Sequence, residues 1–359
     1  MKRLSIITSL TVILLGISSC AAGPNEVGGI GGIGIEDERL AYATPVNKLT
    51  LTTEEEELVS KGNVFATDYL SRVNASTDGD FIISPLSLQF LLGMLDDAKV
   101  NTFYRKLQTQ LSLLDKAATL VIANTDDNVD PNAPTRLMNE MSFKSQWSFG
   151  LGFPKADTRE EMFTLEDGTK KTVATMMMSR AMLQCQGNDV FTAVRLPFGN
   201  LSYSMTVIRP EEGHTVSEAV KSLCDLGWQD FSRNMVSCVA DIWLPKFKTA
   251  FTIKLRDILS QMGLSYYFDS SVDISGSSDI ISISLSQVLQ KVSIAIDEEG
   301  AEASATSTYI TSGGSGSSIS SNSINPANKI VFHADRPFIY IISEWSSGAI
   351  LFAGKYSGI

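Results

Sequence analysis

The stretch from Asp297 to Asn328 constrains the fold of this chain more than any other feature. It reads DEEGAEASATSTYITSGGSGSSISSNSINPAN. So long and weakly hydrophobic a segment is uncommon inside a compact domain unless it is functional or disordered. Its composition alone favours a flexible Ser/Gly linker.

The first half of this stretch argues against a plain linker. In an extended strand, alternate side chains point to opposite faces. One face would carry only small residues and the other only polar ones: Ala301, Ala303, Ala305 and Ser307 against Glu302, Ser304, Thr306 and Thr308. A segment of this kind can be exposed and later enter a packed sheet as a strand, with Gly300 as its hinge.

Composition excludes some classes of function. The chain has 359 residues, 43% hydrophobic and 19% charged, which suffices for a large packed core. Its net charge is −11, and loss of an export peptide with Lys2 and Arg3 would make it more negative still. Such an acidic chain has no electrostatic reason to bind nucleic acid.

The N-terminus is typical of an export signal. Lys2 and Arg3 precede a short apolar run from Leu4 to Ile17, which is too short for a comfortable transmembrane helix. Ile17-Ser18-Ser19-Cys20 resembles the bacterial lipobox, which makes Cys20 the expected mature first residue and lipid anchor. The alternative is an ordinary secretory peptide with Cys20 near the cut. Ala21 rather than aspartate after Cys20 favours the outer membrane over the inner one.

These features predict three regions. Residues 1–19 form a lipoprotein signal peptide, and residues 20–49 hold the lipidated cysteine and a Gly-rich flexible tether. Residues 50–359 form the folded domain, with an exposed loop at about 298–328.

The remaining cysteines, Cys185, Cys224 and Cys238, are odd in number and contain no Cys-x-x-Cys pair. This argues against a disulfide framework, and we expect small buried side chains.

The rest of the chain alternates between helix and strand signals. Apolar residues at helical spacing predict a helix over Thr52–Val73, and Ser84-Pro85 reads as the cap and first position of a second helix through Leu95. Leu255–Met262 is a further helix ending at Gly263. Strands are predicted at Phe81–Ile83, Arg136–Trp147, Phe163–Leu165, Lys171–Val173, Phe191–Pro197, Leu201–Arg209, Val236–Leu244, Val288–Ile296, Lys329–Phe332, Phe338–Trp345 and Leu351–Gly354. The expected class is α+β, with sheets of mostly antiparallel strands.

Several motifs, in order along the chain, resemble those of the serpin family. Glu298-Glu299-Gly300-Ala301-Glu302-Ala303-Ser304-Ala305-Thr306 is similar to the hinge of inhibitory serpins. The other matching motifs are FIISPLS from Phe81, NEMSFKSQW from Asn139, LPKFK from Leu244, FHADRPF from Phe332 and ILFAGK from Ile350.

The resemblance implies a serpin-like fold and a suicide-substrate mechanism. A target protease would cleave the exposed reactive-centre loop, forming an acyl-enzyme. The segment from Gly300 would then insert between the strands near Arg136–Trp147 and Val288–Ile296. The implied partner is a serine protease of elastase or subtilisin type, or a cysteine protease. The chain would be an inhibitor and not an enzyme, a monomer without cofactor or metal.

Two features depart from the family pattern. Between the second helix and Arg136 the chain is shorter than the family by several elements, with Lys116–Asn124 a remnant of one sheet strand. The scissile bond falls at Gly314-Ser315 when counted from the hinge, and near Ile324 when counted back from Phe332. The loop is therefore longer than usual on its far side.

Two other functions stay open. One is a non-inhibitory serpin-like surface binding protein, and the other is a surface lipoprotein that binds glycans or peptides. Catalysis by the chain itself is not expected, because its two histidines, His214 and His333, lie in a turn and in the closing motif and no hydrolase motif accompanies them. The Met176-Met177-Met178 run is expected in the core.

Overall fold

A computed structural model describes most of the folded part of the chain. It describes residues 48–96, 98–114, 119–125, 136–148, 151–269, 272–273, 282–283, 287–301 and 329–359. The predicted signal peptide, Cys20 and most of the tether lie outside the described residues. Among the helices that the structure describes, none is long and apolar enough to cross a membrane.

The first two described helices begin close to the residues that the sequence predicts. Helix α2 runs over Thr53–Ser76, and the Thr52 hydroxyl accepts from the Glu55 N–H while the Glu55 carboxylate accepts from the Thr52 N–H. Strand β1 (Phe81–Ile83) leads into α3 (Pro85–Asp96), where the Ser84 hydroxyl accepts from the Ser87 N–H at 3.3 Å. Both predicted helices are confirmed.

Helix α4 (Ala98–Leu114) was not predicted from the sequence. Its buried side chains recur at intervals of three or four, at Phe103, Leu107, Leu111 and Leu114. This spacing is the usual signal of an amphipathic helix, so periodicity could have found it. It is followed by β2 (Thr119–Thr125), close to the predicted sheet strand at Lys116–Asn124.

The strands form two main sheets. The nine-stranded sheet has the order β1-β16-β15-β7-β6-β5-β8-β14, with β4 on β5. Its members after β1 are β4 (Arg159–Thr164), β5 (Lys170–Gly187), β6 (Phe191–Phe198), β7 (Tyr203–Pro210), β8 (Val236–Pro245), β14 (Lys329–His333), β15 (Phe338–Glu344) and β16 (Ile350–Tyr356).

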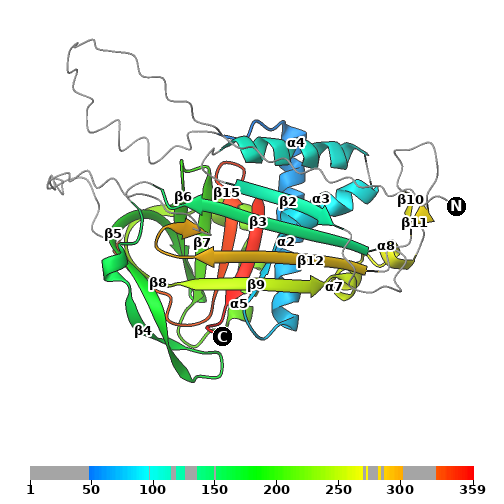
Figure 1. Cartoon of the computed structure of the whole chain (residues 1–359). Coiled ribbons are helices and arrows are strands. Elements are labelled where there is room, and N and C mark those ends of the chain that lie inside the picture. The colour runs from blue at the N-terminus through cyan, green and yellow to red at the C-terminus, as the bar shows by residue number, and fades with distance from the viewer. Residues whose placement is uncertain are drawn as a thin grey trace, which may run out of the picture.

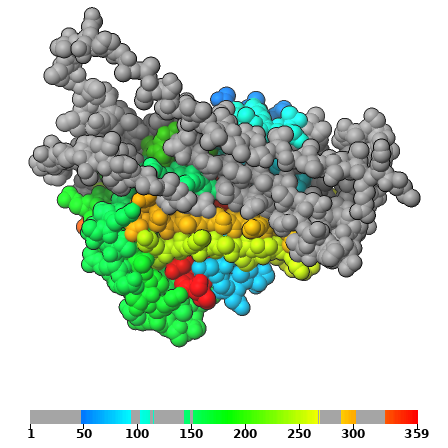
Figure 2. Space-filling view, viewed as in Figure 1, coloured from blue at the N-terminus to red at the C-terminus, as the bar shows by residue number. Residues whose placement is uncertain are grey.

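The five-stranded sheet has the order β2-β3-β13-β12-β9 and contains β3 (Arg136–Gln146), β9 (Phe247–Lys254), β12 (Gln287–Ile296) and β13 (Gly300–Ala301). Figure 1 shows its strands crossing in front of β15 and β16 at a steep angle. In Figure 2, β12 and β9 form neighbouring bands on the surface. The expected α+β class with mostly antiparallel pairs is confirmed, and β12–β3 and β14–β8 are parallel.

Two apolar clusters hold these layers together. One lies between the sheets and includes the buried Phe143, Phe198 and Phe352. The other lies under α2, α3, α5 (Val216–Leu226), α6 (Trp228–Arg233) and α7 (Arg256–Gln261) and includes Trp228. The small elements η1 (Lys155–Asp157), α8 (Tyr266–Asp269), β10 (Val272–Asp273) and β11 (Ser282–Ile283) complete the described chain. Of the methionine run predicted in the core, Met176 and Met178 are buried and Met177 is partly exposed.

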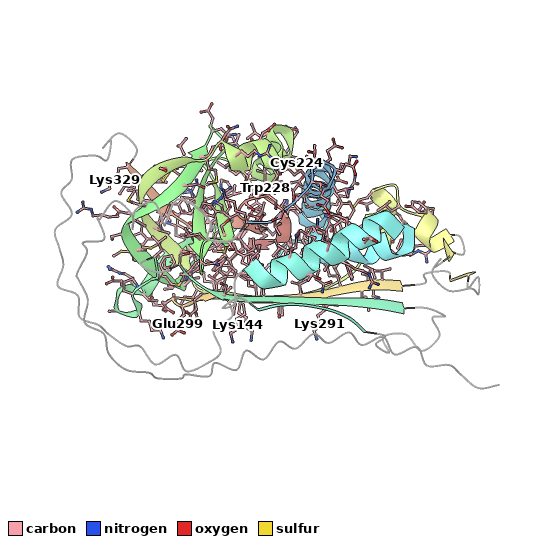
Figure 3. All side chains as sticks on the ribbon, turned by 90° about the horizontal axis from the view of Figure 1, so that it is seen from above. Lys144, Cys224, Trp228, Lys291, Glu299 and Lys329 are labelled. Carbon is pink, nitrogen blue, oxygen red and sulfur yellow. A yellow bond between two sulfur atoms is a disulfide. The ribbon has the colours of Figure 1, made fainter. Side chains whose placement is uncertain are left out.

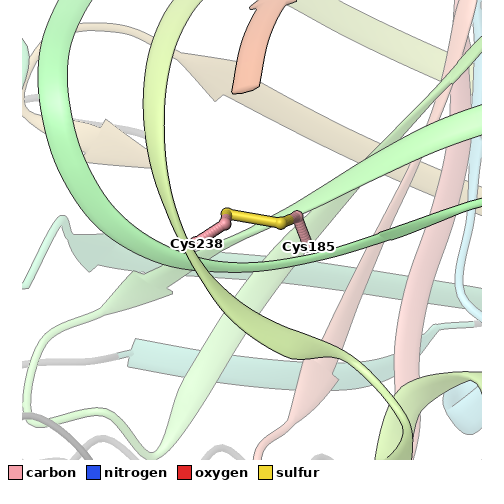
Figure 4. The surroundings of a disulfide bond; sticks show 2 residues. All are labelled: Cys185 and Cys238. Atoms are coloured by element: carbon pink, nitrogen blue, oxygen red, sulfur yellow. A yellow bond between two sulfur atoms is a disulfide. The ribbon is translucent and has the colours of Figure 1, made fainter. Parts of the chain in front are cut away.

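The prediction against a disulfide is wrong. Cys185 on β5 and Cys238 on β8 are bonded, with their Cα atoms 6.1 Å apart (Figure 4). The two residues are 53 positions apart in sequence, and only the antiparallel pairing of β5 with β8 brings them together. Cys224 is free and half-buried.

Candidate functional site

The described end of the predicted hinge, Gly300–Ala301, lies between the two strands expected as its borders. Strands β12 and β3 are paired in parallel from Gln287 opposite Arg136 to Ser293 opposite Ser142. Beyond Ser293 they separate, and β13 begins between them. Gly300 and Ala301 pair antiparallel with Gln146 and Ser145, and Ala301 also lies opposite Ile296. The chain thus enters the sheet at this end.

A tight turn aims the chain into this position. The Asp297 carboxylate accepts from the N–H groups of Glu299 and Gly300, at 2.8 and 3.2 Å. Trp147, directly after β3, holds the turn, because its backbone N–H donates to the Glu299 carbonyl and its indole N–H donates to the Asp297 carbonyl at 2.9 Å. The Trp147 ring stacks on Phe198, with centroids 4.6 Å apart.

Gly300 is required by the geometry of this entry point. Its φ is +147°, which side-chain-bearing residues rarely adopt. A Cβ atom there would lie 2.7 Å from the Cα of Gln146 and closer still to the Ser145 carbonyl oxygen. The next residue, Ala301, is 1% exposed, so the first small residue of the predicted inward face is already buried.

Glu298 anchors the turn by a buried carboxylate. One oxygen accepts from the Thr158 hydroxyl at 2.8 Å, and the other lies 2.7 Å from the Lys246 ammonium. Burial raises the pKa of the Glu298 carboxyl, but the hydrogen bonds from Lys246, the backbone and Thr158 together outweigh it, so the pKa lies below its usual value. The carboxylate is therefore ionised and bound to two other segments.

Glu299 makes a contact of a different kind. Its carboxylate lies 2.5 Å from the ammonium of Lys155, whose side chain is largely exposed. The hydrogen bond to Glu299 raises the pKa of Lys155. Figure 3 shows Glu299 at one end of the five-stranded sheet, with Lys144 and Lys291 projecting from the outer face of the same sheet.

A buried polar cluster beneath β12 was missed by the sequence reasoning. The Gln290 side chain is fully buried, and its amide oxygen accepts from the Ser84 N–H at 3.0 Å and the Tyr69 hydroxyl at 3.1 Å. Its amide nitrogen donates to the Ser84 carbonyl and the Ser87 hydroxyl, at 2.8 and 3.2 Å. The sequence signal for this cluster is Gln290 itself, a polar residue within the largely apolar predicted strand Val288–Ile296.

The Gln290 cluster ties the insertion border to the helices behind it. Tyr69 comes from α2, and Ser84 and Ser87 come from the start of α3. Burial raises the pKa of Tyr69 well above its ordinary value, so its hydroxyl stays a hydrogen-bond donor. The cluster fixes β12 against the two helices.

The other candidate residues are placed as follows. Of the predicted hinge, Glu298, Glu299, Gly300 and Ala301 are described. Glu302, Ala303, Ser304, Ala305, Thr306, Gly314 and Ser315 lie outside the described residues, as does Cys20. His214 lies in the expected turn, 3.5 Å from Glu218, and His333 contacts the Trp243 ring. Among the described residues, no group of three or more His, Cys, Asp or Glu could hold a metal ion.

Comparison with known proteins points to one family. The family model described as serpin (serine protease inhibitor) matches residues 119–358. Serpin B3 of Homo sapiens is 30% identical over 236 residues, which cover 65% of this chain and 57% of that protein. Iripin-3 of Ixodes ricinus is 30% identical over 243 residues, covering 67% and 59%. The chain therefore spans less than two thirds of the length of these relatives.

Solved structures show the same fold. The thermophilic serpin tengpin in its native state superposes with a TM-score of 0.68 and 22% identity, covering 89% of this chain and 99% of tengpin. Serpin48 of Tenebrio molitor gives a TM-score of 0.66 at 20% identity, covering 86% and 100%.

Proposed function

The chain belongs to the serpin (serine protease inhibitor) family, and from this premise we propose that it inhibits proteases as a suicide substrate. The observation that carries the proposal is the position of Ala301, buried between β12 and β3 and paired with both. The segment that follows would continue this short strand once it is cut free at its far end.

The sheet topology supplies a reason for insertion to be favourable. In the uncut chain, β12 and β3 share one parallel ladder over Gln287–Ser293. Strand β13 is antiparallel to both, so its extension would replace that ladder with two antiparallel ones. Antiparallel pairing is slightly more stable per residue than parallel pairing. The inserted strand would also form hydrogen bonds through its own backbone N–H and C=O groups.

The chemistry of capture belongs to the target protease. Its nucleophile would attack a carbonyl of the loop, form an acyl-enzyme with the part that includes Gly300, and release the amine of the part leading to Lys329. Insertion would then carry the acylated protease along β3 before water hydrolyses the ester or thioester. The chain contributes the loop, the hinge and the sheet. The proposed targets are elastase-like or subtilisin-like serine proteases, or cysteine proteases.

A non-inhibitory binding protein is the second candidate. The observation that favours it is the short connection from α4 to β3, in which β2 is the only sheet strand described. On this hypothesis the fold is kept and the loop is cleaved without trapping the protease.

We further propose that the protein is exported and lipid-anchored through Cys20 at a bacterial cell envelope, in the outer membrane and exposed at the surface. The basic start, the short apolar run and Ile17-Ser18-Ser19-Cys20 support this. The folded domain would then begin near residue 50. Radiolabelled palmitate should be incorporated into the wild-type chain and not into Cys20→Ser, and labelling of both would refute the anchor.

The test of inhibition uses the chain lacking residues 1–20, incubated with subtilisin, pancreatic elastase and papain. We expect a complex that survives denaturing electrophoresis, a cut that mass spectrometry places between Gly313 and Ser323, and a higher melting temperature for the cleaved chain. Ala305→Arg would place a charge on the inward face and should convert the inhibitor into a substrate. In the matched control Thr306→Arg the charge would fall on the outward face of the inserted strand, and this variant should still trap the protease. Cleavage without complex or stabilisation would favour the binding-protein hypothesis.

A further inference from the structure

The outer face of the five-stranded sheet carries a group of lysines on a chain that is acidic overall. Lys291 of β12 and Lys248 and Lys254 of β9 are exposed, and Lys144 of β3 is half-buried. In Figure 3, Lys144 and Lys291 project from the outer side of the sheet, away from the helices. The whole chain has 29 Lys and Arg against 40 Asp and Glu, so this face differs in sign from the average of the molecule.

The strand register places these lysines on one face. Their neighbours in sequence, among them Phe247, Thr249 and Val292, are buried, and successive side chains of a strand point to opposite faces. Lys248 lies opposite Ala295 of β12. Between the lysines of β9 and β12, the outward residues are small: Ala250, Thr252, Ser293 and Ala295. We call the face formed by Lys144, Lys248, Lys254 and Lys291 the basic sheet face.

The charge of the basic sheet face stays positive when all charged residues of its strands are counted. The five strands of this sheet contain these four lysines, Arg136 and a single acidic residue, Glu140. Glu140 lies opposite Lys291 in the register. Strands β9 and β12 contain no Asp or Glu at all. The sheet therefore presents a local excess of positive charge on a protein whose net charge is −11.

Among the helices that the structure describes, none lies over the basic sheet face. In Figure 1 the strands β3, β12 and β9 lie in front of the helices, and Figure 3 shows the helices on the opposite side of the sheet from Lys144 and Lys291. The apolar residues of β9 and β12 are buried on that inner side. In the described part of the chain, the basic sheet face is therefore open to a partner.

The spacing of the lysines fits a plane of anionic groups better than a single polyanionic chain. Lys248 and Lys254 are six residues apart on β9, which corresponds to roughly 20 Å along the strand. Lys144 is three strand positions from β9 in the sheet order, or roughly 14 Å across the strands. A linear polyanion that followed β9 would miss Lys144. A lipid surface carries its phosphates in two dimensions, and the small residues between the lysines allow it to approach closely.

We propose that the basic sheet face docks on anionic lipid headgroups of the membrane that carries the Cys20 anchor. This rests on the proposed location at the cell envelope. Lysines close to an anionic membrane surface each strengthen binding about 5-fold. A lipid chain combined with a polybasic patch holds a protein more durably than either does alone. Bound in this way, the sheet that receives the reactive-centre loop would lie along the membrane surface.

The connection from the anchor to the domain is long enough for this orientation. From Cys20 to Lys48 there are about 28 residues, which span at most roughly 95 Å. A domain of about 310 residues has a radius of gyration of about 20 Å and is therefore roughly 50 Å across. The domain can thus turn any of its faces toward the bilayer, and the charge on the basic sheet face selects one.

The test measures partition of the chain lacking residues 1–20 into vesicles of phosphatidylcholine with phosphatidylglycerol, and into vesicles of phosphatidylcholine alone. We expect binding to the anionic vesicles only, weaker at high salt. Lys248→Gln combined with Lys254→Gln should lower the partition coefficient about 25-fold at an unchanged melting temperature. The matched control is Lys61→Gln combined with Lys170→Gln, on α2 and β5, which removes the same charge from exposed positions elsewhere and should leave partition unchanged.

The outcomes separate the basic sheet face from the lipid anchor. Loss of partition in the Lys248/Lys254 pair but not in the control pair would support the proposal, and either single substitution tests it if the pair fails to fold. An equal loss in both pairs would overturn it, because total charge and not the face would then be responsible. No partition of the wild-type chain, or binding of soluble dextran sulfate without binding of vesicles, would also overturn it. The test chain lacks Cys20, so failed palmitate labelling would refute the anchor and leave the vesicle result standing.

Discussion

Replacing Glu298 by glutamine should loosen the hinge, whereas the same change at the adjacent Glu299 should not. Glu298→Gln keeps the size of the side chain and removes its charge. The carboxylate side chain is only 6% exposed and binds Lys246 and Thr158, which lie on two other segments. Glu299 binds Lys155, whose side chain is 65% exposed.

The expected magnitude follows from burial. Removing one partner of a fully buried ion pair costs about 3–5 kcal/mol, but Lys246 is 38% exposed and can be resolvated after the substitution. We therefore expect a loss of about 1.5–2 kcal/mol, in the range of a hydrogen bond to a charged group. At about 2 °C per kcal/mol for a domain of this size, the melting temperature should fall by roughly 3–4 °C. Glu299→Gln should change it within experimental error.

The pH dependence provides a second, independent check. The pKa of Glu298 is lowered in the folded chain, so its contribution to stability is present above the ordinary glutamate pKa of 4.5 and is lost as pH falls through the lower folded value. The difference in melting temperature between wild type and Glu298→Gln should be full at pH 7 and shrink below pH 4.5. Equal effects of the two substitutions at pH 7, or a difference that persists unchanged at pH 3, would refute this account.

Three further predictions concern the hinge, the buried cluster and the disulfide. Gly300→Ala should destabilise the uncut chain by about 2–4 kcal/mol in urea unfolding, because its φ is glycine-like and a Cβ atom meets the backbone of β3; an unchanged midpoint would contradict this. Gln290→Leu should cost about 2–4 kcal/mol in the same assay, because it removes the side-chain oxygen that accepts from the Ser84 N–H and the Tyr69 hydroxyl. A neutral effect would show that the cluster does not hold β12. In the chain lacking residues 1–20, thiol titration after denaturation should find one free thiol, Cys224, and three free thiols would refute the disulfide. Reduction of Cys185–Cys238 should lower the free energy of unfolding by up to about 4 kcal/mol, because the disulfide closes a loop of 53 residues.

Local patterns made much of the fold predictable. The helical spacing from Thr52, the cap and proline at Ser84-Pro85 and the strand Val288–Ile296 each depend on residues close in sequence, and the structure has an element at each. The hinge segment was recognisable for the same reason, since alternating small and polar residues follow one glycine. The helix over Ala98–Leu114 also carried a local signal, which was overlooked.

Only the tertiary structure decided which distant residues meet. Gln290 reaches Ser84 across 206 positions, Glu298 reaches Thr158 across 140, and Cys185 bonds Cys238 across 53. These contacts follow from the order and register of strands in the two sheets, and many alternative pairings would satisfy the same alternation. The sequence by itself determined the alternation of small and polar residues after Gly300, and the family resemblance named the two bordering strands. The tertiary structure decided how Gly300 and Ala301 pair with β12 and β3 and which buried side chains hold them there, because burial and pairing depend on the packing of the whole domain.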